Sequence, residues 1–586
     1  MRRKRWPTAL RRSIPGVLAL AFVCLAAARF ARLAAAPDEA ALVTLSIVGT
    51  SDLHGVALPK NGGIGGGLPL LAGYVNNLRA ARAADGGAVL LIDSGDTFQG
   101  DVESNLSEGA VVVDAYNAMG YTAEAIGNHD FDFGSVDTPA ARQSPGDLRG
   151  ALKARAAQAR SPFLAANLID EATGRPVEWP NVRPSVLVDV SGIKIGIVGV
   201  MTIDALQSTI AANVQGLRIA PLGPAIVANA SKLRAAGADV VVVAAHAGGR
   251  CERFDQPLDL SSCESESEIF RVARSLPPEL VDVIAAGHTH SGLGHLVNGI
   301  GIIQPYSRDQ SFGRVDVVLD RRTRRVARIR SFAPQSIVPA EYEGKAVTSD
   351  PAIVRAMAPA LQRVHDLQAT PLGVSLGAPI HRAGNGGSPL GSLLATALRE
   401  SAHADVAAIN NADRGLRADL AAGPLTFGRL YDVFPYDNRV ARITLSGAQL
   451  AEWLTGEIQQ GRQSGLGISG VEMRTSCKAD GLHVDLFRGD VRIQGDDHLV
   501  AVTIGGPTPS GGLASSAPVL SGGPIGKAPI VREVVEDWFR RLGPTAKRQL
   551  DDATHRSPAF VDAQIVECIA PDAAGGAPTR VAAVAW

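Results

Sequence analysis

The sequence lacks a surplus of charge of either sign: its 57 Lys and Arg residues are balanced by 58 Asp and Glu residues, for a formal net charge of −1. A chain without a positive surplus does not attract nucleic acid by bulk electrostatics, so we expect no nucleic-acid partner. The sequence also has no repeat period and no heptad run, so neither a repeat architecture nor a coiled coil is predicted. Its 586 residues are too many for one hydrophobic core and predict two domains with a connection.

The N-terminus has the pattern of a targeting segment. Basic residues at positions 2–5 and 11–12 precede an apolar run from Ile14 to Ala28, and small residues follow at positions 34–36. This order is typical of a signal peptide. We expect residues 1–36 to be a cleaved signal or an uncleaved N-terminal membrane anchor. In either case the rest of the chain is expected in the periplasm or outside the cell.

Cysteine is scarce, with 5 residues and no C-x-x-C spacing, so a zinc site built on four cysteines has no support from the spacing. Beyond Cys24, four cysteines remain, an even number in a chain that we expect to be exported. Pairing within each domain predicts the disulfides Cys251–Cys263 and Cys477–Cys568.

Five apolar runs each lead into a glycine-containing turn with Asp, Asn or His side chains. The runs cover residues 42–48, 88–93, 118–126, 238–245 and 281–286, and we interpret them as buried strands. The side chains that follow them are Asp52, His54, Asp96, Asn128, His129, His246, His288 and His290. Because open α/β sheets place their chemistry at the carboxyl ends of strands, we expect these side chains to converge on one site.

The types of side chain in this set favour two divalent cations. We expect Asp52, His54 and His290 to hold one ion, Asn128, His246 and His288 to hold the other, and Asp96 to bridge them. Mixed nitrogen and oxygen ligands suit zinc, manganese or similar ions. A pair of ions about 3.5–4 Å apart matches the charge and geometry of phosphate ester hydrolysis. His129 can donate to a phosphoryl oxygen, and Asp132 is close enough in sequence to orient its imidazole.

These motifs resemble those of a known superfamily. Asp52-Leu-His54, Gly95-Asp96, Gly127-Asn128-His129-Asp130, His246-Ala-Gly248 and Gly287-His288-Thr-His290 look like the motifs of calcineurin-type metallophosphoesterases. More narrowly, the chain resembles the secreted 5′-nucleotidase / UDP-sugar hydrolase / 2′,3′-cyclic phosphodiesterase family. The resemblance implies an α/β fold and assigns His129 and Asp132 as the catalytic dyad. It also implies a four-layered αββα sandwich at residues 41–335, a linker helix at 345–370 and a smaller α/β substrate-binding domain at 371–586.

The linker helix is also indicated by the sequence itself. Apolar residues recur at helical spacing at Ile353, Met357, Leu361, Val364 and Leu367. The alternative interpretation is a plain C-terminal helix of the first domain.

The second half of the chain resembles the narrower family through short motifs in the same order, at residues 388–398, 404–417, 423–428, 434–438 and 445–450. The implied substrate-binding residues are Arg382, Arg414 and Arg417 for phosphate, Asn411 or Asn410 for a base, and Tyr436 as a stacking ring. The glycine-rich loop that supplies a second ring in the family has no counterpart, because residues 503–513 contain no aromatic residue. The expected substrate is therefore a phosphate ester, with nucleoside 5′-monophosphates or related nucleotides as the specific hypothesis.

Two other classes of function remain open from the sequence. One is a sulfur-oxidation hydrolase, which shares this fold and its dimetal site. The other is a non-catalytic binding protein that uses the same scaffold, although every expected metal ligand and His129 are present. The oligomeric state is not indicated.

Overall fold

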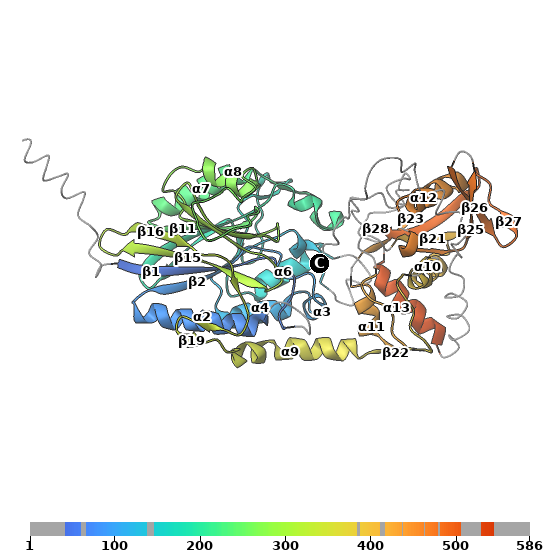
Figure 1. Cartoon of the computed structure of the whole chain (residues 1–586), viewed down its shortest axis with the longest axis horizontal. Coiled ribbons are helices and arrows are strands. Elements are labelled where there is room, and N and C mark those ends of the chain that lie inside the picture. The colour runs from blue at the N-terminus through green and yellow to red at the C-terminus, as the bar shows by residue number, and fades with distance from the viewer. Residues whose placement is uncertain are drawn as a thin grey trace, which may run out of the picture.

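The computed structural model describes residues 42–59, 66–136, 146–383, 387–410, 416–435, 438–461, 463–478, 481–505 and 529–543. The elements form two bodies, one from β1 to β19 and one from β20 to α13 (Figure 1). Helix α9, Pro351–Gln368, runs along the first body and ends at the second. The expected signal or anchor at residues 1–36 lies outside the described residues. Within the described part of the chain, no helix has the length and apolarity needed to span a membrane.

The first body contains two large sheets. One has the order β16-β15-β1-β2-β3-β4-β7, with β17 paired to β15, and the other has the order β13-β14-β12-β11-β9-β8. The strands of the first are β1 Leu42–Thr50, β2 Ala88–Asp93, β3 Ala123–Ala125, β4 Phe163–Leu164, β7 Val182–Arg183, β15 Ser311–Asp320, β16 Arg325–Ser331 and β17 Gln335–Ser336. Those of the second are β8 Ser185–Val190, β9 Ile193–Met201, β11 Val240–His246, β12 Val283–Ala286, β13 Gly292–Val297 and β14 Ile300–Pro305.

The two sheets pack face to face with helices outside both. Strand β11 is buried along its whole length, because alternate residues face different cores. Val240 and Val242 belong to the core between the sheets, whereas Val241 and Val243 belong to the core beneath the outer helices. The helices of this body are α2 Gly67–Ala84, α3 Val102–Asn105, α4 Ala110–Met119, α6 Gly150–Gln158, α7 Leu222–Ala235 and α8 Glu268–Ser275. This arrangement confirms the expected αββα layering.

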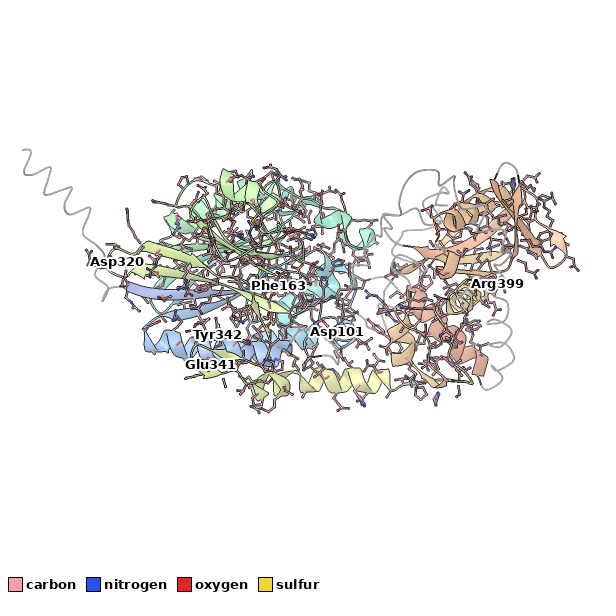
Figure 2. The ribbon with its side chains drawn as sticks, viewed as in Figure 1. Asp101, Phe163, Asp320, Glu341, Tyr342 and Arg399 are labelled. Atoms are coloured by element: carbon pink, nitrogen blue, oxygen red, sulfur yellow. A yellow bond between two sulfur atoms is a disulfide. The ribbon has the colours of Figure 1, made fainter. Side chains whose placement is uncertain are left out.

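Two smaller sheets complete the first body. They are β5 Leu168–Asp170, β6 Arg175–Pro176 and β10 Leu217–Ile219 in a three-stranded sheet, and the pair β18 Glu341–Tyr342 and β19 Lys345–Ala346. The β18–β19 pair covers α2, where the Tyr342 ring lies 5.1 Å from the Tyr74 ring, and Figure 2 labels Glu341 and Tyr342 at this place.

The second body is a smaller α/β unit. Its main sheet has the order β23-β28-β21-β24, from β21 Val406–Asn410, β23 Arg439–Ser446, β24 Leu466–Ser469 and β28 His498–Gly505. Its helices are α10 Pro389–Ser401, α11 Phe427–Val433, α12 Gly447–Gln459 and α13 Val531–Leu542. The remaining strands are β20 Pro371–Leu376, β22 Gly423–Thr426, β25 Glu472–Lys478, β26 Gly481–Arg488 and β27 Val491–Arg492. Figure 2 labels Arg399 on α10.

Helix α9 packs on both bodies. It begins at Pro351 after Asp350, whose side chain accepts a hydrogen bond from the Ala352 amide and caps the first turn. Its residues Ile353 and Met357 are buried in the core shared with α2 and α4, and its far end contacts α11. The bodies also meet directly, because Val102 and Leu106, in and just after α3, pack against the core of the second body. The predicted domain bounds stay a prediction.

Candidate active site

The carboxyl ends of strands from both sheets of the first body meet at one place. Asp52 and Asp96 follow the adjacent parallel strands β1 and β2, which pair Thr50 with Asp93, and Asn128 follows β3. His246 ends β11, and His288 and His290 follow β12, which is parallel to β11 in the second sheet. The turns interlock, since the Asp52 amide donates to the Gly95 carbonyl (2.9 Å) and the His54 amide to the Asp96 carbonyl (3.0 Å). The expected convergence of these side chains is present.

The backbone at this place is strained. Five non-glycine residues have left-handed backbone conformations: Asp52 (φ 51°), His54 (φ 50°), Asp96 (φ 55°), His288 (φ 75°) and His290 (φ 52°). Such conformations cost of the order of 1–2 kcal/mol for a residue with a Cβ, and they cluster at functional sites. All five are among the metal ligands predicted from the sequence.

Two groups of possible ligands share one carboxylate. Asp52, His54, Asp96 and His290 place their ligand atoms within 4.8 Å of one another, and so do Asp96, His246 and His288. In the first group His54 Nε2 is 3.0 Å from His290 Nε2, and His290 Nε2 is 3.5 Å from Asp52 Oδ1. In the second, Asp96 Oδ2 is 3.3 Å from His246 Nε2. Asp96 is therefore shared by the two groups of possible metal ligands.

The second group also includes the amide of Asn128. Asn128 Oδ1 lies 2.9 Å from His246 Nε2, and His288 Nδ1 lies 3.2 Å from the same nitrogen. The other ring nitrogens are oriented from outside the groups. His246 Nδ1 donates to the Ser94 carbonyl (2.9 Å) and His54 Nδ1 to the Gln99 carbonyl (2.8 Å), which leaves each Nε2 directed into the site.

The charges at the site fit divalent cations. Asp52 (0% exposed) and Asp96 (1% exposed) have no Lys or Arg partner among the described residues, and a buried carboxylate needs a compensating positive charge. Burial lowers the pKa of His54 and of His288 to about 4 each, so both imidazoles are neutral ligands near pH 7. Burial also acts to lower the pKa of His246, but the Asp96 carboxylate outweighs it and raises that pKa to about 10. The negative charge of Asp96, which favours the protonated form of His246, also attracts a metal ion.

A His–Asp pair lies beside these groups. His129 Nδ1 is 2.7 Å from Asp132 Oδ2, and the His129 amide donates to Asp96 Oδ1 (2.8 Å). Burial opposes protonation of the ring, yet Asp96 and Asp132 together raise the pKa of His129 to about 9. These two carboxylates favour the protonated, hydrogen-bond-donating form of the ring, and its side chain is 29% exposed.

The glycines of the motifs permit close approach of two turns. A Cβ at Gly127 would lie 2.2 Å from Asp96 Oδ1, and one at Gly95 would lie 2.7 Å from the Gly127 amide nitrogen. Gly95 also has a φ of 92°. Only glycine at both positions lets the β2 and β3 turns meet at the shared carboxylate.

Sequence reasoning missed the role of Asp130. Its buried carboxylate accepts hydrogen bonds from the amides of Gly127 (2.8 Å) and Thr97 (2.9 Å), so it joins the two turns. Asp130 was visible in the motif, but nothing in its spacing distinguishes a carboxylate that binds backbone amides from one that binds a metal.

The substrate residues predicted in the second body are described only in part. Arg382 and Arg417 are brought together: the Arg382 amide donates to Asp419 Oδ1 (2.9 Å), and Arg382 Nη1 donates to the Arg417 carbonyl (2.8 Å). Both arginine side chains are exposed. The predicted residues Asn411, Arg414 and Tyr436 lie outside the described residues, and nothing is described of the Asn410 side chain.

The predicted disulfide between Cys251 and Cys263 is present in the structure, which confirms that pairing. It closes the segment that follows β11, next to the site. Cys477 on β25 is disulfide-bonded, and its predicted partner Cys568 lies outside the described residues, so the identity of the partner stays a prediction.

Comparison with known proteins extends these observations. Residues 368–496 match the family model described as 5′-nucleotidase, C-terminal domain. The chain is similar to endonuclease YhcR of Bacillus subtilis (25% identical over 472 residues, 78% of this chain and 36% of YhcR). It is also similar to protein UshA of Yersinia enterocolitica (24% identical over 491 residues, 77% of this chain and 82% of UshA). Its structure is similar to that of the 5′-nucleotidase precursor from Thermus thermophilus, with a TM-score of 0.52 at 20% identity, over 86% of this chain and 97% of that one.

The chain covers different shares of its two sequence relatives. The chain spans about a third of YhcR but four fifths of UshA. The UshA match covers more of this chain than either body contains, so it reaches across both. The likeness to the Thermus structure shows the two-body α/β fold.

Proposed function

Because the chain belongs to the 5′-nucleotidase family, with a calcineurin-like N-terminal and a 5′-nucleotidase C-terminal domain, we propose that it is an exported, metal-dependent hydrolase of phosphate esters. One observation supports this above all others: Asp96 belongs to both groups of possible metal ligands, with the His129–Asp132 pair beside it. Two ions bridged by one carboxylate and flanked by a proton donor suit displacement at a phosphoryl group.

The residues that would hold two divalent ions, zinc, manganese or similar, are those that converge at the strand ends. Asp52, His54 and His290 would hold one, Asn128, His246 and His288 the other, and Asp96 both. When bound, such ions supply Lewis acidity toward a phosphoryl oxygen and lower the pKa of water. The protein holds their ligands in place through strained turns and through the two carbonyls that fix the tautomers of His54 and His246.

We assign proton donation in the reaction to His129. Its protonated ring can donate to a phosphoryl oxygen or to the leaving oxygen, and Asp132 keeps the ring in one orientation through Nδ1. Neither residue belongs to the two groups of possible metal ligands.

We propose nucleoside 5′-monophosphates or related nucleotides as the substrates. The family membership of the C-terminal domain and the exposed Arg382–Arg417 pair support a phosphate-binding pocket in the second body. Asn411 and Arg414 would contact the base and the phosphate, and Tyr436 would stack on the base.

Export to the periplasm or the cell exterior is part of the same proposal. It is supported by the N-terminal targeting pattern and by the Cys251–Cys263 disulfide, since stable disulfides are typical of compartments outside the cytoplasm.

A substrate panel tests the proposal. Purified protein is assayed with AMP, UDP-glucose, 2′,3′-cyclic AMP and bis-p-nitrophenyl phosphate, with and without Mn²⁺, and its metal content is measured. We expect Mn²⁺-dependent release of phosphate from AMP. Sulfate release from S-sulfocysteine without phosphate release would instead indicate a sulfur-oxidation hydrolase. Absence of both bound metal and turnover would indicate a binding protein.

A further inference from the structure

The segment between β9 and β10 lies against the His129–Asp132 pair. It contains two short 3-10 helices, Ala205–Gln207 and Ala211–Val214, which are joined by residues 208–210. Its start is tied to the metal-ligand groups, because the Thr202 amide donates to the His246 carbonyl (2.8 Å). Its end is tied to the turn of the pair, because Asn213 Nδ2 donates to the Phe131 carbonyl (2.8 Å). Residues 208 and 209 are therefore fixed relative to the site at both ends of the segment.

Thr209 makes one hydrogen bond that reaches the pair directly. Its hydroxyl donates to Asp132 Oδ1 at 2.7 Å, while Asp132 Oδ2 lies 2.7 Å from His129 Nδ1. Each carboxylate oxygen thus has its own partner, and Thr209 is only 4% exposed, so water does not compete for the bond. A bond to an ionised acceptor at this distance is among the stronger hydrogen bonds in proteins. Two bonds on opposite oxygens fix both the position and the rotation of the carboxylate.

The preceding residue acts on a possible metal ligand. The Ser208 carbonyl accepts a hydrogen bond from Asn128 Nδ2 (3.0 Å), which leaves Asn128 Oδ1 directed toward His246 Nε2. An amide that was rotated by half a turn would present its NH₂ group to the site instead. Two successive residues of one segment therefore set the orientations of a ligand and of the dyad's carboxylate.

We propose that Thr209 is a positioning residue for the reaction, acting through Asp132 to hold the His129 ring at the angle from which it donates. The proposal rests on the proposed phosphoesterase function. Without the hydroxyl, the Asp132 carboxylate keeps His129 as its one hydrogen-bond partner among the described residues, and the two side chains rotate together. The donor then spends less time aligned with the leaving oxygen. Substrate binding should be unaffected, because neither Thr209 nor Asp132 is among the residues proposed to bind the substrate.

The test compares Thr209→Val, which removes the hydroxyl at nearly constant volume, with Thr209→Ser, which retains it. We expect Thr209→Val to lower kcat on AMP about 10- to 100-fold, the range typical of outer partners of site residues, with KM nearly unchanged. Thr209→Ser should restore most of the loss. The loss should be smaller on bis-p-nitrophenyl phosphate, because its good leaving group needs less help from a proton donor.

A double variant separates positioning from general support of the fold. In a His129→Ala background, Thr209→Val should have no further effect on kcat, because the residue that it positions is gone. Thr455→Val is the matched control: it removes a half-buried hydroxyl that donates to the Ala451 carbonyl on α12, and should leave kcat unchanged. An equal loss with and without His129, or no loss in Thr209→Val, overturns the proposal.

A measurement that does not depend on turnover separates the proposed phosphoesterase function from the positioning role of Thr209. In chelator-treated protein, the Nδ1 proton of His129 bonded to Asp132 should give a downfield proton resonance, and Thr209→Val should shift or broaden it while Thr455→Val does not. If the wild type hydrolyses no phosphate ester but this resonance responds to Thr209→Val, the proposed function fails and the positioning role stands. If the wild type is active and the resonance is indifferent to Thr209, the positioning role is wrong.

Discussion

Among the described residues, Asp96 is the one that belongs to both groups of possible metal ligands. Its Oδ2 lies 4.0 Å from His54 Nε2 and 3.3 Å from His246 Nε2. Its Oδ1 accepts a hydrogen bond from the His129 amide. We expect Asp96→Asn to abolish turnover and to reduce bound metal to one equivalent or less, because an amide oxygen carries no charge to bridge two cations. Metal analysis by mass spectrometry and the AMP assay measure the two effects.

The matched control is Asp282→Asn, which changes a buried carboxylate bonded to Arg234 and to the Val241 amide on the outer side of the second sheet. That variant should lose stability but keep its metal and its kcat. Wild-type metal content and activity in Asp96→Asn would remove the dimetal assignment.

Substitution of His129 distinguishes a role in the chemical step from a role in metal binding. It contacts Asp132 through Nδ1 and lies outside both ligand groups. We expect His129→Ala to lower kcat about 10²- to 10⁴-fold on AMP while metal content stays at the wild-type value, as for loss of a general acid. Steady-state kinetics and metal analysis on the same preparation decide this, and a fall in metal content would make His129 a ligand.

Strand β3 contains a buried acid that has no part in the proposed mechanism. Glu124 is fully buried, and its Oε1 accepts a hydrogen bond from the Ser161 hydroxyl (2.5 Å), while its Oε2 has no hydrogen-bond partner among the described residues. Burial raises the pKa of Glu124 to about 8 from the ordinary value of 4.5. Between these two values the folded protein holds a proton that the unfolded chain has released. The free energy of unfolding therefore falls as pH rises through this window.

Glu124→Gln tests that consequence. The neutral isostere removes the titration, so we expect the urea midpoint of the wild type to fall from pH 5 to pH 8 and that of the variant to fall less. The difference at pH 8 should be of the order of 1–4 kcal/mol, since each unit of pKa shift is worth about 1.4 kcal/mol. Equal pH dependence in the two proteins would mean that Glu124 is ionised in the folded state.

The strand ends were the part of the site that the sequence could predict. A strand buried on both faces, such as β11, is a continuous apolar run, and the glycine and polar residues after it are visible in the sequence. Thr209 could not be found in this way. It lies 77 residues from Asp132 in the sequence, in a segment without periodicity. Only the packing of that segment on the β3 turn brings the two side chains together.

Helix α9 also differs in part from what its sequence predicts. The predicted apolar face included Leu367, which is 40% exposed, whereas Ile353, Met357 and Val364 are buried. Periodicity indicates which residues share a face of the helix, but not where along its length a neighbour stops covering that face. The helix was predicted at residues 345–370 and begins at Pro351, because Asp350 caps it there.

Over the two bodies together, the groups of possible metal ligands and the residues proposed for substrate binding lie in different bodies. The ligand groups lie in the first body, and the Arg382–Arg417 pair lies in the second. Substitutions in the second body should therefore change KM for nucleotides and leave the metal content unchanged. Tyr436 is the residue that the resemblance to the family implies for stacking on the base, and it lies outside the described residues.

We expect Tyr436→Ala to raise KM for AMP about 5- to 100-fold, following the ~1–3 kcal/mol that stacking on one ring contributes. Its kcat on a small aryl phosphate, which has no base, should stay almost unchanged. Kinetics on both substrates give the answer. Equal losses on the two substrates would assign Tyr436 to the support of the fold.

The strand ends that supply the ligands come from both sheets, and this fixes when in the life of the chain a metal site can exist. Asp52 and Asp96 belong to one sheet, His246 and His288 to the other, and the last ligand, His290, is encoded near the middle of the chain. A nascent chain has no complete site until both sheets are made and packed, because the ligands of each ion are then brought together for the first time. If the chain crosses the membrane before it folds, its ions are chosen by the supply on the far side rather than by that of the cytoplasm.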